Sequence, residues 1–194
     1  MEPRGVIALW DQDTKKYTIY ASSQNIHVMR DTVANMLNVD RNSVRFKAFD
    51  VGGGFGSKNF CYAEYALVAW ASRKINKPVR WTSTRSELFI SDHQARDHNS
   101  VSRLAIADDG KFIALEINSV ANLGAYMVGS SGGVQVVQYA NLPGTVYKIP
   151  SICLNISAAF TNKTPTGVFR GPGYAETNLI LERLIDAAAL KHNF

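Results

Sequence analysis

Residues 51–58, Val-Gly-Gly-Gly-Phe-Gly-Ser-Lys, constrain the fold of this chain more than any other segment. Four glycines surround a single phenylalanine, and an apolar, strand-like run at 44–49 leads into them. Glycine permits positive φ and lets backbone amides approach a ligand without side chains in the way. A second glycine-bearing segment, Phe-Arg-Gly-Pro-Gly at 169–173, leads into a helical pattern. We call these the first and second glycine loops, and their occurrence in one short chain points to a bound anionic cofactor.

Composition limits the classes of protein to which the chain can belong. Its 194 residues fit one domain or two small lobes, and we expect a single domain over 1–194. A hydrophobic fraction of 46% and a charged fraction of 19% are typical of a globular protein. The net charge of +5 is scattered, without a dense basic tract, and no apolar run is long enough to span a bilayer. We therefore expect no nucleic-acid partner and no membrane span.

The two cysteines, Cys61 and Cys153, form no Cys-x-x-Cys pair and belong to no cluster with zinc-ligand spacing. Such sparse cysteine usage is typical of a reducing compartment. We expect a cytoplasmic protein.

Hydrophobic periodicity predicts an alternation of hairpins and helices. Period-two patterns predict two hairpins and further strands, whereas 3.6-residue spacing predicts three longer helices. The hairpins are expected at 5–10 with 16–22 and at 100–107 with 112–122, the strands at 44–48, 79–82 and 152–160, and the helices at 27–37, 61–75 and 175–190. Thr84 and Glu87 form a capping-box pattern before a short helix, and segment 122–147 is expected to be irregular. The fold class is therefore α+β (mixed α/β), because the long hairpins argue against a purely parallel sheet.

Taken alone, the first glycine loop leaves several interpretations open. A phosphate-binding P-loop requires G-x-x-x-x-G-K-[ST], but counting from Gly52 the chain has Ser57 and Asn59 at two required positions. A dinucleotide fingerprint also fails at Ser57. A glycine-rich tight turn before a helix explains the loop as well as a ligand site does, because a lone glycine motif is a weak signal.

The two loops together resemble the molybdenum hydroxylases, the family of xanthine dehydrogenase, aldehyde oxidase and aerobic carbon monoxide dehydrogenase. The resemblance is specifically to the large, molybdopterin-binding subunit, and it covers nearly the whole chain. Further matching segments occur in the family's order: Tyr-Ala-Ser-Ser-Gln-Asn at 20–25, Thr-Arg-Ser-Glu at 84–87, Tyr-Lys-Ile-Pro at 147–150, and Glu-Arg-x-x-Asp at 182–186. The resemblance implies the first half of the family's molybdopterin-binding region.

The resemblance implies a set of cofactor-binding residues. Gln24 matches the glutamine whose side-chain amide donates to a molybdenum ligand, although by itself it could be an ordinary polar residue at a strand end. The amides of Phe55 and Gly56 are expected to donate to oxygen ligands of the metal, with Gly54 beside them. In the second glycine loop, Phe169 and Arg170 match the residues next to the metal, where the plain alternative for the arginine is a surface cation. The resemblance implies no catalytic residue and no direct metal ligand within this chain.

Departures from the family pattern narrow the substrate. Purine-oxidising members carry a glutamate where this chain has Asn59, an arginine where it has Gln138, and a phenylalanine where it has Pro172. These three residues are the expected substrate-pocket positions, and their identities disfavour xanthine. Carbon monoxide dehydrogenases carry a cysteine in the second glycine loop, which this chain lacks. The resemblance leaves aldehydes or N-heterocycles as small-molecule substrates, with an aldehyde favoured.

The resemblance also implies cofactors and partners outside the chain. Family members carry molybdopterin, here expected in its cytosine dinucleotide form, and pass electrons to [2Fe–2S] clusters and FAD on partner domains or subunits. The family's glutamate base lies in sequence beyond residue 194, so the isolated chain is expected to be inactive. The expected partners are the remaining molybdopterin domain, an iron–sulfur subunit and a FAD subunit. The alternative is a non-catalytic remnant or interaction module without cofactor.

Overall fold

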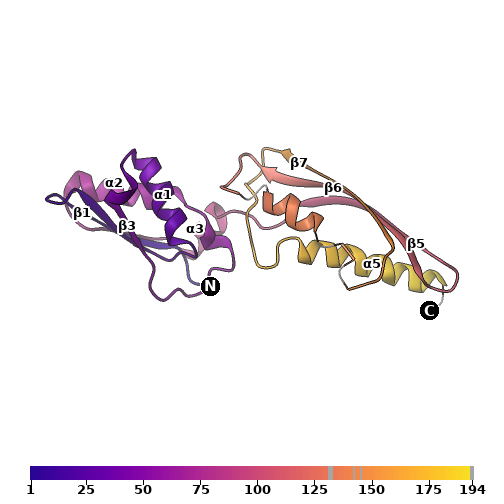
Figure 1. Ribbon diagram of the computed structural model, residues 1–194. Helices are drawn as coiled ribbons and strands as arrows, with labels where there is room; N and C mark the ends of the chain where they lie inside the picture. Colours follow the sequence, from indigo (N-terminus) through magenta and orange to yellow (C-terminus); the bar gives the residue numbers. More distant parts are fainter. Residues whose placement is uncertain (131–132, 142, 145, 193–194) are drawn as a thin grey trace. The chain divides into compact units, whose positions relative to one another are not determined.

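The computed structural model describes residues 1–130, 133–141, 143–144 and 146–192, and the chain divides into two compact units, 1–92 and 93–194 (Figure 1). Each unit has its own hydrophobic core. That the two act together as a single domain over 1–194 stays a prediction. No helix among the described residues is both long and apolar enough to cross a membrane.

The N-terminal unit is built on a four-stranded mixed sheet with the order β3-β2-β1-β4. The predicted hairpin is confirmed, because β1 (Gly5–Asp11) pairs antiparallel with β2 (Lys16–Ala21). Strand β3 (Val44–Lys47) lies parallel to β2, and β4 (Val79–Thr82) lies antiparallel to β1. The short edge strands therefore bracket the hairpin.

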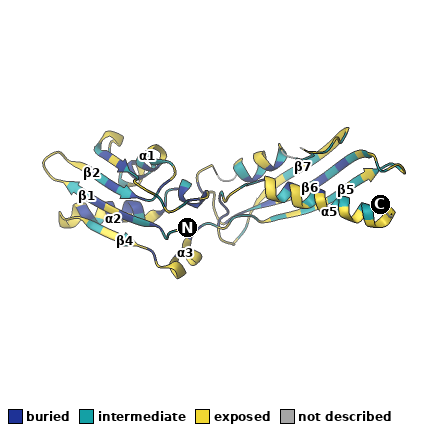
Figure 2. Cartoon of the chain, turned by 90° about the horizontal axis from the view of Figure 1, so that it is seen from below, coloured by how far each residue is buried: buried dark blue, intermediate teal, exposed yellow. Residues whose placement is uncertain are grey.

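The helices of this unit are α1 (Ile26–Leu37), α2 (Ala63–Ile75) and α3 (Arg85–Ser91). All three were predicted, and the capping box is confirmed because Thr84 Oγ1 accepts from the amide of Glu87 while the Glu87 carboxylate accepts from the amide of Thr84. Apolar side chains of α1 and α2 pack against the sheet to form the core. Figure 2 shows the buried residues of this unit in dark blue. The core includes Ala8, Ile19, Met29, Val33, Tyr65 and Ala69.

Helical spacing in the sequence predicts an apolar stripe of Ala66, Ala69 and Trp70 along α2, and this prediction was wrong at one position. Trp70 is 52% exposed, whereas Tyr65, Ala69 and Ser72 are buried. These three residues follow helical spacing along one face, and Trp70 is turned about 100° from Ala69. Helical spacing likewise predicts Met36 on the same inner face of α1 as Met29 and Val33, but Met36 is exposed.

The C-terminal unit contains a three-stranded sheet with the order β5-β6-β7. Strands β5 (His98–Ile106) and β6 (Phe112–Gly124) form the second predicted hairpin, and β7 (Ser151–Phe160) lies parallel to β6. Both sheets are thus mixed, which confirms the α+β (mixed α/β) class.

One face of this sheet is covered by α5 (Tyr174–His192), which runs along the strands in Figure 1. Leu181 of α5 packs with Leu115, Ile117 and Tyr139 in the core of the unit. Within the segment expected to be irregular, residues Val134–Gln138 form η3, a single π-helical turn. Residues 131–132, 142 and 145 of that segment lie outside the described residues.

Candidate functional site

The first glycine loop is held at both ends by the N-terminal unit. The amide of Glu2 donates to the carbonyl of Gly52 at 3.1 Å, and the Glu2 carboxylate accepts from Lys58 Nζ at 2.9 Å. The Lys58 side chain is fully buried, and its hydrogen bond lowers the pKa of Glu2 below the ordinary value of 4.5. The carbonyl of Lys58 in turn accepts from the amide of Gln24 at 3.0 Å. The loop is therefore fixed against the segment that follows β2.

Gln24 lies directly over the first glycine loop. Its Oε1 accepts from the amide of Gly56 at 2.8 Å. Because a backbone N–H can only donate, this contact assigns the oxygen to the loop side and directs the Nε2 donors away from Gly56. A Cβ on Gly54 would lie 2.6 Å from Gln24 Cδ, so only glycine leaves room for the glutamine at this place. The structure thus brings together three of the residues expected to bind cofactor.

Phe55 occupies a backbone conformation that side-chain-bearing residues rarely adopt. Its φ is +53°, in the left-handed region, at a cost of about 1–3 kcal/mol. Its ring folds over Gly53, where a Cβ would lie 2.6 Å from the ring, and the side chain is 45% exposed. Gly56 follows with φ +102°. Strain of this kind gathers at functional sites, which supports a functional rather than a purely connecting role for the loop.

The second glycine loop is held by Arg96, which the sequence analysis did not single out. Arg96 Nη2 donates to the carbonyl of Phe169 at 3.1 Å and also to the carbonyl of Arg170. Its Nε lies 3.2 Å from Glu176 Oε1, in the first turn of α5. One guanidinium therefore fixes the loop backbone relative to the helix that follows, while the Phe169 and Arg170 side chains are exposed.

Gln135 provides a second support for the same region. This side chain is 1% exposed, and its Nε2 donates to the carbonyls of Ala95 and Gly167, both at 2.9 Å. The Gln135 carbonyl lies 3.2 Å from His98 Nε2, at the start of β5. The buried side-chain amide of Gln135 thus joins segments 94–97 and 165–170. In the sequence alone, nothing distinguishes Gln135 from the nearby Gln138.

Two of the three expected substrate-pocket positions lie close together. A Cβ on Gly173 would lie 2.8 Å from the carbonyl carbon of Gln138, so the turn at Pro172 and Gly173 rests on the end of η3. Asn59, the third position, ends the short 3₁₀ turn η2 (Ser57–Asn59) in the N-terminal unit. The grouping of Gln138 with Pro172 is therefore local to the C-terminal unit.

A buried cation also supports the first glycine loop. Arg4 is fully buried and pairs with Asp92 at 2.7 Å and with Glu64 at 3.0 Å. Its guanidinium lies 3.7 Å from the ring centroid of Tyr62, whose hydroxyl donates to the carbonyl of Ser57 in the first glycine loop. Burial raises the pKa of Asp92. A lone arginine near the start of a chain carries no sequence signal for such burial.

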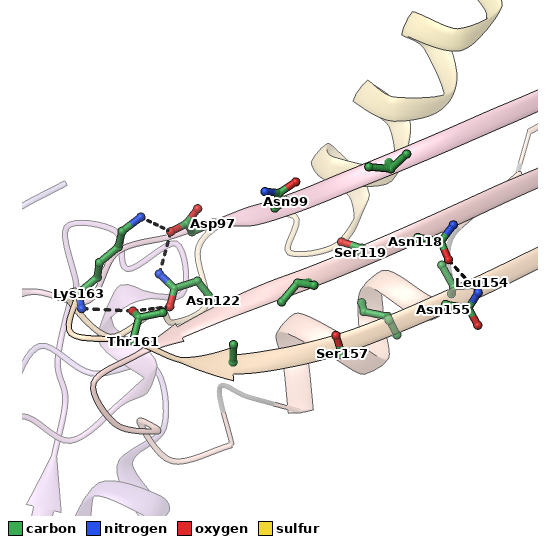
Figure 3. A pocket seen from close by; sticks show the side chains of 14 residues that line it. Asp97, Asn99, Asn118, Ser119, Asn122, Leu154, Asn155, Ser157, Thr161 and Lys163 are labelled. Atoms are coloured by element: carbon green, nitrogen blue, oxygen red, sulfur yellow. Dashed lines mark hydrogen bonds and ion pairs between the residues drawn. The ribbon is translucent and has the colours of Figure 1, made fainter.

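A separate groove lies on the C-terminal unit. A groove of about 970 Å³ runs along the face of the β5-β6-β7 sheet that α5 does not cover, and none of the expected site residues lines it (Figure 3). Among the described residues, no group of three or more His, Cys, Asp or Glu could hold a metal ion.

Comparison with known proteins identifies the family. The family model described as "Molybdopterin cofactor-binding domain" matches residues 1–194. The chain belongs to this family. Its resemblance to the molybdenum hydroxylases, inferred from the two glycine loops, is thereby confirmed.

Relatives and solved structures agree with this assignment. The chain is 32% identical over 189 residues to the 6-hydroxypseudooxynicotine dehydrogenase complex subunit gamma of Paenarthrobacter nicotinovorans, covering 97% of this chain and 23% of the relative. It is 31% identical over 195 residues to the carbon monoxide dehydrogenase large chain of Hydrogenophaga pseudoflava, covering 100% of this chain and 24% of the relative. The structure of quinoline 2-oxidoreductase from Pseudomonas putida 86 matches with a TM-score of 0.91 at 32% identity, covering 100% of this chain and 25% of that one. The chain therefore spans about a quarter of the length of the proteins it matches.

Proposed function

We propose that this chain is part of the molybdopterin-binding large subunit of an oxidoreductase that hydroxylates a small molecule with oxygen derived from water. The observation that carries the proposal is the hydrogen bond from the Gly56 amide to Gln24 Oε1, which directs the two N–H donors of the Gln24 side chain outward. Gln24 can lie this close to the loop because position 54 is glycine. When bound, the molybdenum pterin would supply the two-electron redox chemistry of the hydroxylation.

The residues around the first glycine loop fit an anionic group. The donors are neutral: the Gln24 carboxamide and the backbone amides of Phe55 and Gly56, as the resemblance implies. In the structure the Gly56 amide donates to Gln24 Oε1, so it acts first by orienting Gln24. Donation from Gly56 to a cofactor ligand would require an exchange of that partner. The Nε2 donors of Gln24, which this hydrogen bond orients, are the preorganised ones, and preorganised donors stabilise charge without reorganisation cost.

The second glycine loop is proposed to contribute Phe169 and Arg170. The guanidinium of Arg170 carries a permanent positive charge that suits an anionic cofactor. Arg96 is proposed to act through this loop, because it holds the carbonyls of both residues. We therefore regard Arg96 and Gln135 as positioning residues for the second glycine loop.

Asn59, Gln138 and Pro172 are proposed to line the substrate pocket, and the substrate is proposed to be an N-heterocycle or an aldehyde. Quinoline 2-oxidoreductase, at 32% identity, and nicotine 6-hydroxylase large subunit of P. nicotinovorans, at 30%, are named for N-heterocycles. Aldehyde oxidase 2 of Cavia porcellus, also at 30%, is named for aldehydes. Both substrate classes therefore stay in the proposal, and the preference for an aldehyde has no support in these names.

The proposed complex contains the remaining molybdopterin domain, an iron–sulfur subunit with [2Fe–2S] clusters and a FAD subunit, with the pterin in its cytosine dinucleotide form. The names "complex subunit gamma" and "large chain" describe relatives that belong to multi-subunit assemblies. We propose that the isolated chain is inactive and that the complex is cytoplasmic.

Isotope labelling tests this proposal. The complex would be purified through a tag on this chain and incubated with a pyridine-ring substrate, and separately with an aldehyde, in H₂¹⁸O. Mass spectrometry should find ¹⁸O in the hydroxylated product. Label acquired only from ¹⁸O₂ would contradict the proposal. A complex that carries no molybdenum and forms no product would favour the non-catalytic module instead.

A further inference from the structure

The π-helical turn η3 carries one of the proposed substrate-pocket positions, because Val134–Gln138 ends at Gln138. A π turn closes its hydrogen bonds over one residue more than an α-helical turn, and such single turns are rare and frequently lie at functional sites. One additional residue rotates the side chains that follow by about 100° relative to a continuous α-helix. The direction of the Gln138 side chain therefore depends on whether this segment keeps its π turn.

His98, at the start of β5, contacts the turn at two places. Its Nε2 lies 3.2 Å from the carbonyl oxygen of Gln135, within the turn. Because a carbonyl can only accept, this contact assigns the imidazole proton to Nε2. The imidazole also stacks on the ring of Tyr139, the residue directly after the turn, with centroids 4.8 Å apart and an interplanar angle of 10°. One side chain therefore supports both the middle and the end of η3.

Tyr139 provides a second attachment between the turn and the sheet. Its hydroxyl lies 3.2 Å from Ser100 Oγ. Ser100 Oγ in turn lies 2.8 Å from the Oγ of Ser119, its direct partner on β6. His98 and Ser100 are two positions apart on β5, so their side chains face the same side of the sheet. Strand β5 thus holds η3 through two consecutive side chains of one face.

This polar network is buried within the C-terminal unit itself. Gln135 is 1% exposed and Tyr139 is fully buried. Tyr139 also packs in the core of the unit with Leu115 and Ile117. Since these side chains are already enclosed by their own unit, the network does not depend on what covers the outer surfaces of the unit in a longer subunit.

We propose that His98 and Tyr139 are positioning residues for the substrate pocket, because they hold η3 as a π turn and so fix the direction of Gln138. The inference rests on the proposed function, in which Gln138 lines that pocket. Gln138 is exposed, and a carboxamide both donates and accepts hydrogen bonds, so its direction determines how a polar substrate is oriented. The end of the turn also contacts the second glycine loop, where a Cβ on Gly173 would lie 2.8 Å from the amide nitrogen of Tyr139. A change in the turn would therefore also shift the neighbouring Pro172.

Four variants of the complex, purified through a tag on this chain, separate the contacts. His98→Phe keeps an aromatic ring to stack on Tyr139 and removes the donor to Gln135, whereas His98→Gln returns an N–H donor. Ser100→Ala removes the partner of the Tyr139 hydroxyl. Ser102→Ala is the matched control, because Ser102 lies on the same strand and face, and its buried Oγ has no hydrogen-bond partner among the described residues.

Two readouts are combined with the molybdenum content of each variant. The first is hydrogen exchange of peptides covering 133–141, and the second is KM and kcat for the pyridine-ring compound or aldehyde that the wild type hydroxylates. With His98→Phe and Ser100→Ala, exchange should be several-fold faster and KM about three- to tenfold higher, the effect of one lost hydrogen bond. Molybdenum content and kcat should change little, because the network acts on substrate binding. His98→Gln should bring KM back toward the wild-type value, and Ser102→Ala should change neither readout.

Unchanged exchange with His98→Phe would show that His98 does not hold the turn, and faster exchange with an unchanged KM would show that the turn does not orient the substrate. Either result overturns the inference, as would equal effects of Ser100→Ala and Ser102→Ala. A wild-type complex that holds no molybdenum and forms no product would contradict the proposed function, and this inference with it. That failure is recognisable without any variant, so the two can be told apart.

Discussion

Replacing Gly54 with alanine would place a methyl group where the Gln24 side chain lies, 2.6 Å from Cδ and 2.7 Å from Cγ. The backbone can accept alanine, because Gly54 does not have a positive φ. Gln24 is exposed, so its side chain should turn into solvent and release the Gly56 amide. Loss of that hydrogen bond costs about 0.5–1.5 kcal/mol. The reduced entropy of the unfolded chain returns about 0.4–1 kcal/mol. The free energy of unfolding should therefore change by no more than about 1 kcal/mol.

The assay combines urea unfolding with hydrogen exchange of the Gly56 amide. In the variant this amide should exchange several-fold faster, while amides in the core of the unit keep their protection. Gly124→Ala is the matched control, because Gly124 has φ +74° and its added Cβ would lie 2.6 Å from the backbone nitrogen of Pro165. That control should cost more than about 2 kcal/mol, since backbone cannot move aside as a flexible side chain can. Equal losses for the two variants, or an unchanged Gly56 amide, would refute the assignment of Gln24 to this place.

Three further outcomes follow from other contacts. Arg96→Lys removes the planar fork that holds the second glycine loop, so urea unfolding should show a loss of about 1–2 kcal/mol, and no loss would contradict its positioning role. Lys58→Met should raise the pKa of Glu2, measured by NMR titration, toward its ordinary value of 4.5, because the hydrogen bond from Lys58 is the main cause of the lowered pKa. In the wild type the lowered pKa gives stability that is present above pH 4.5 and lost as pH falls through the folded-state value. Burial raises the pKa of the Cys61 thiol to about 12. In the native protein a thiol reagent at pH 8 should therefore modify the exposed Cys153 rapidly and Cys61 only on unfolding. Equal rates for the two cysteines would show that Cys61 is accessible.

Local signals in the sequence were sufficient for most of the secondary structure. The two hairpins follow from alternating residues around polar turns, and α3 follows from the Thr84 capping box, because these features act over a few residues. The parallel pairing of β6 with β7 was not predicted, since it depends on contacts between distant segments. Trp70 illustrates the same limit. Periodicity identifies an apolar stripe along a helix, but it does not decide whether a residue at the edge of that stripe, such as Trp70, is buried or exposed.

The candidate site was predictable where a residue pattern marks it. The expected association of Gln24 with the first glycine loop depended on the resemblance, and the structure has the two in contact over a separation of 32 residues. Arg96 and Gln135 were missed, because each acts through carbonyl groups of distant residues and backbone acceptors leave no trace in side-chain patterns. Arg4 was missed for a related reason, since a buried cation is recognisable only once its partners are in place.

The most direct test of the central claim is the molybdenum content of the complex purified through this chain, measured by mass spectrometry of the metal. The account predicts molybdenum in stoichiometric amounts with the wild-type chain. It predicts a marked loss with Gly54→Ala, which should keep the fold while displacing Gln24. A wild-type complex that contains its partner subunits and carries no molybdenum would contradict the claim that these residues form part of a molybdopterin site.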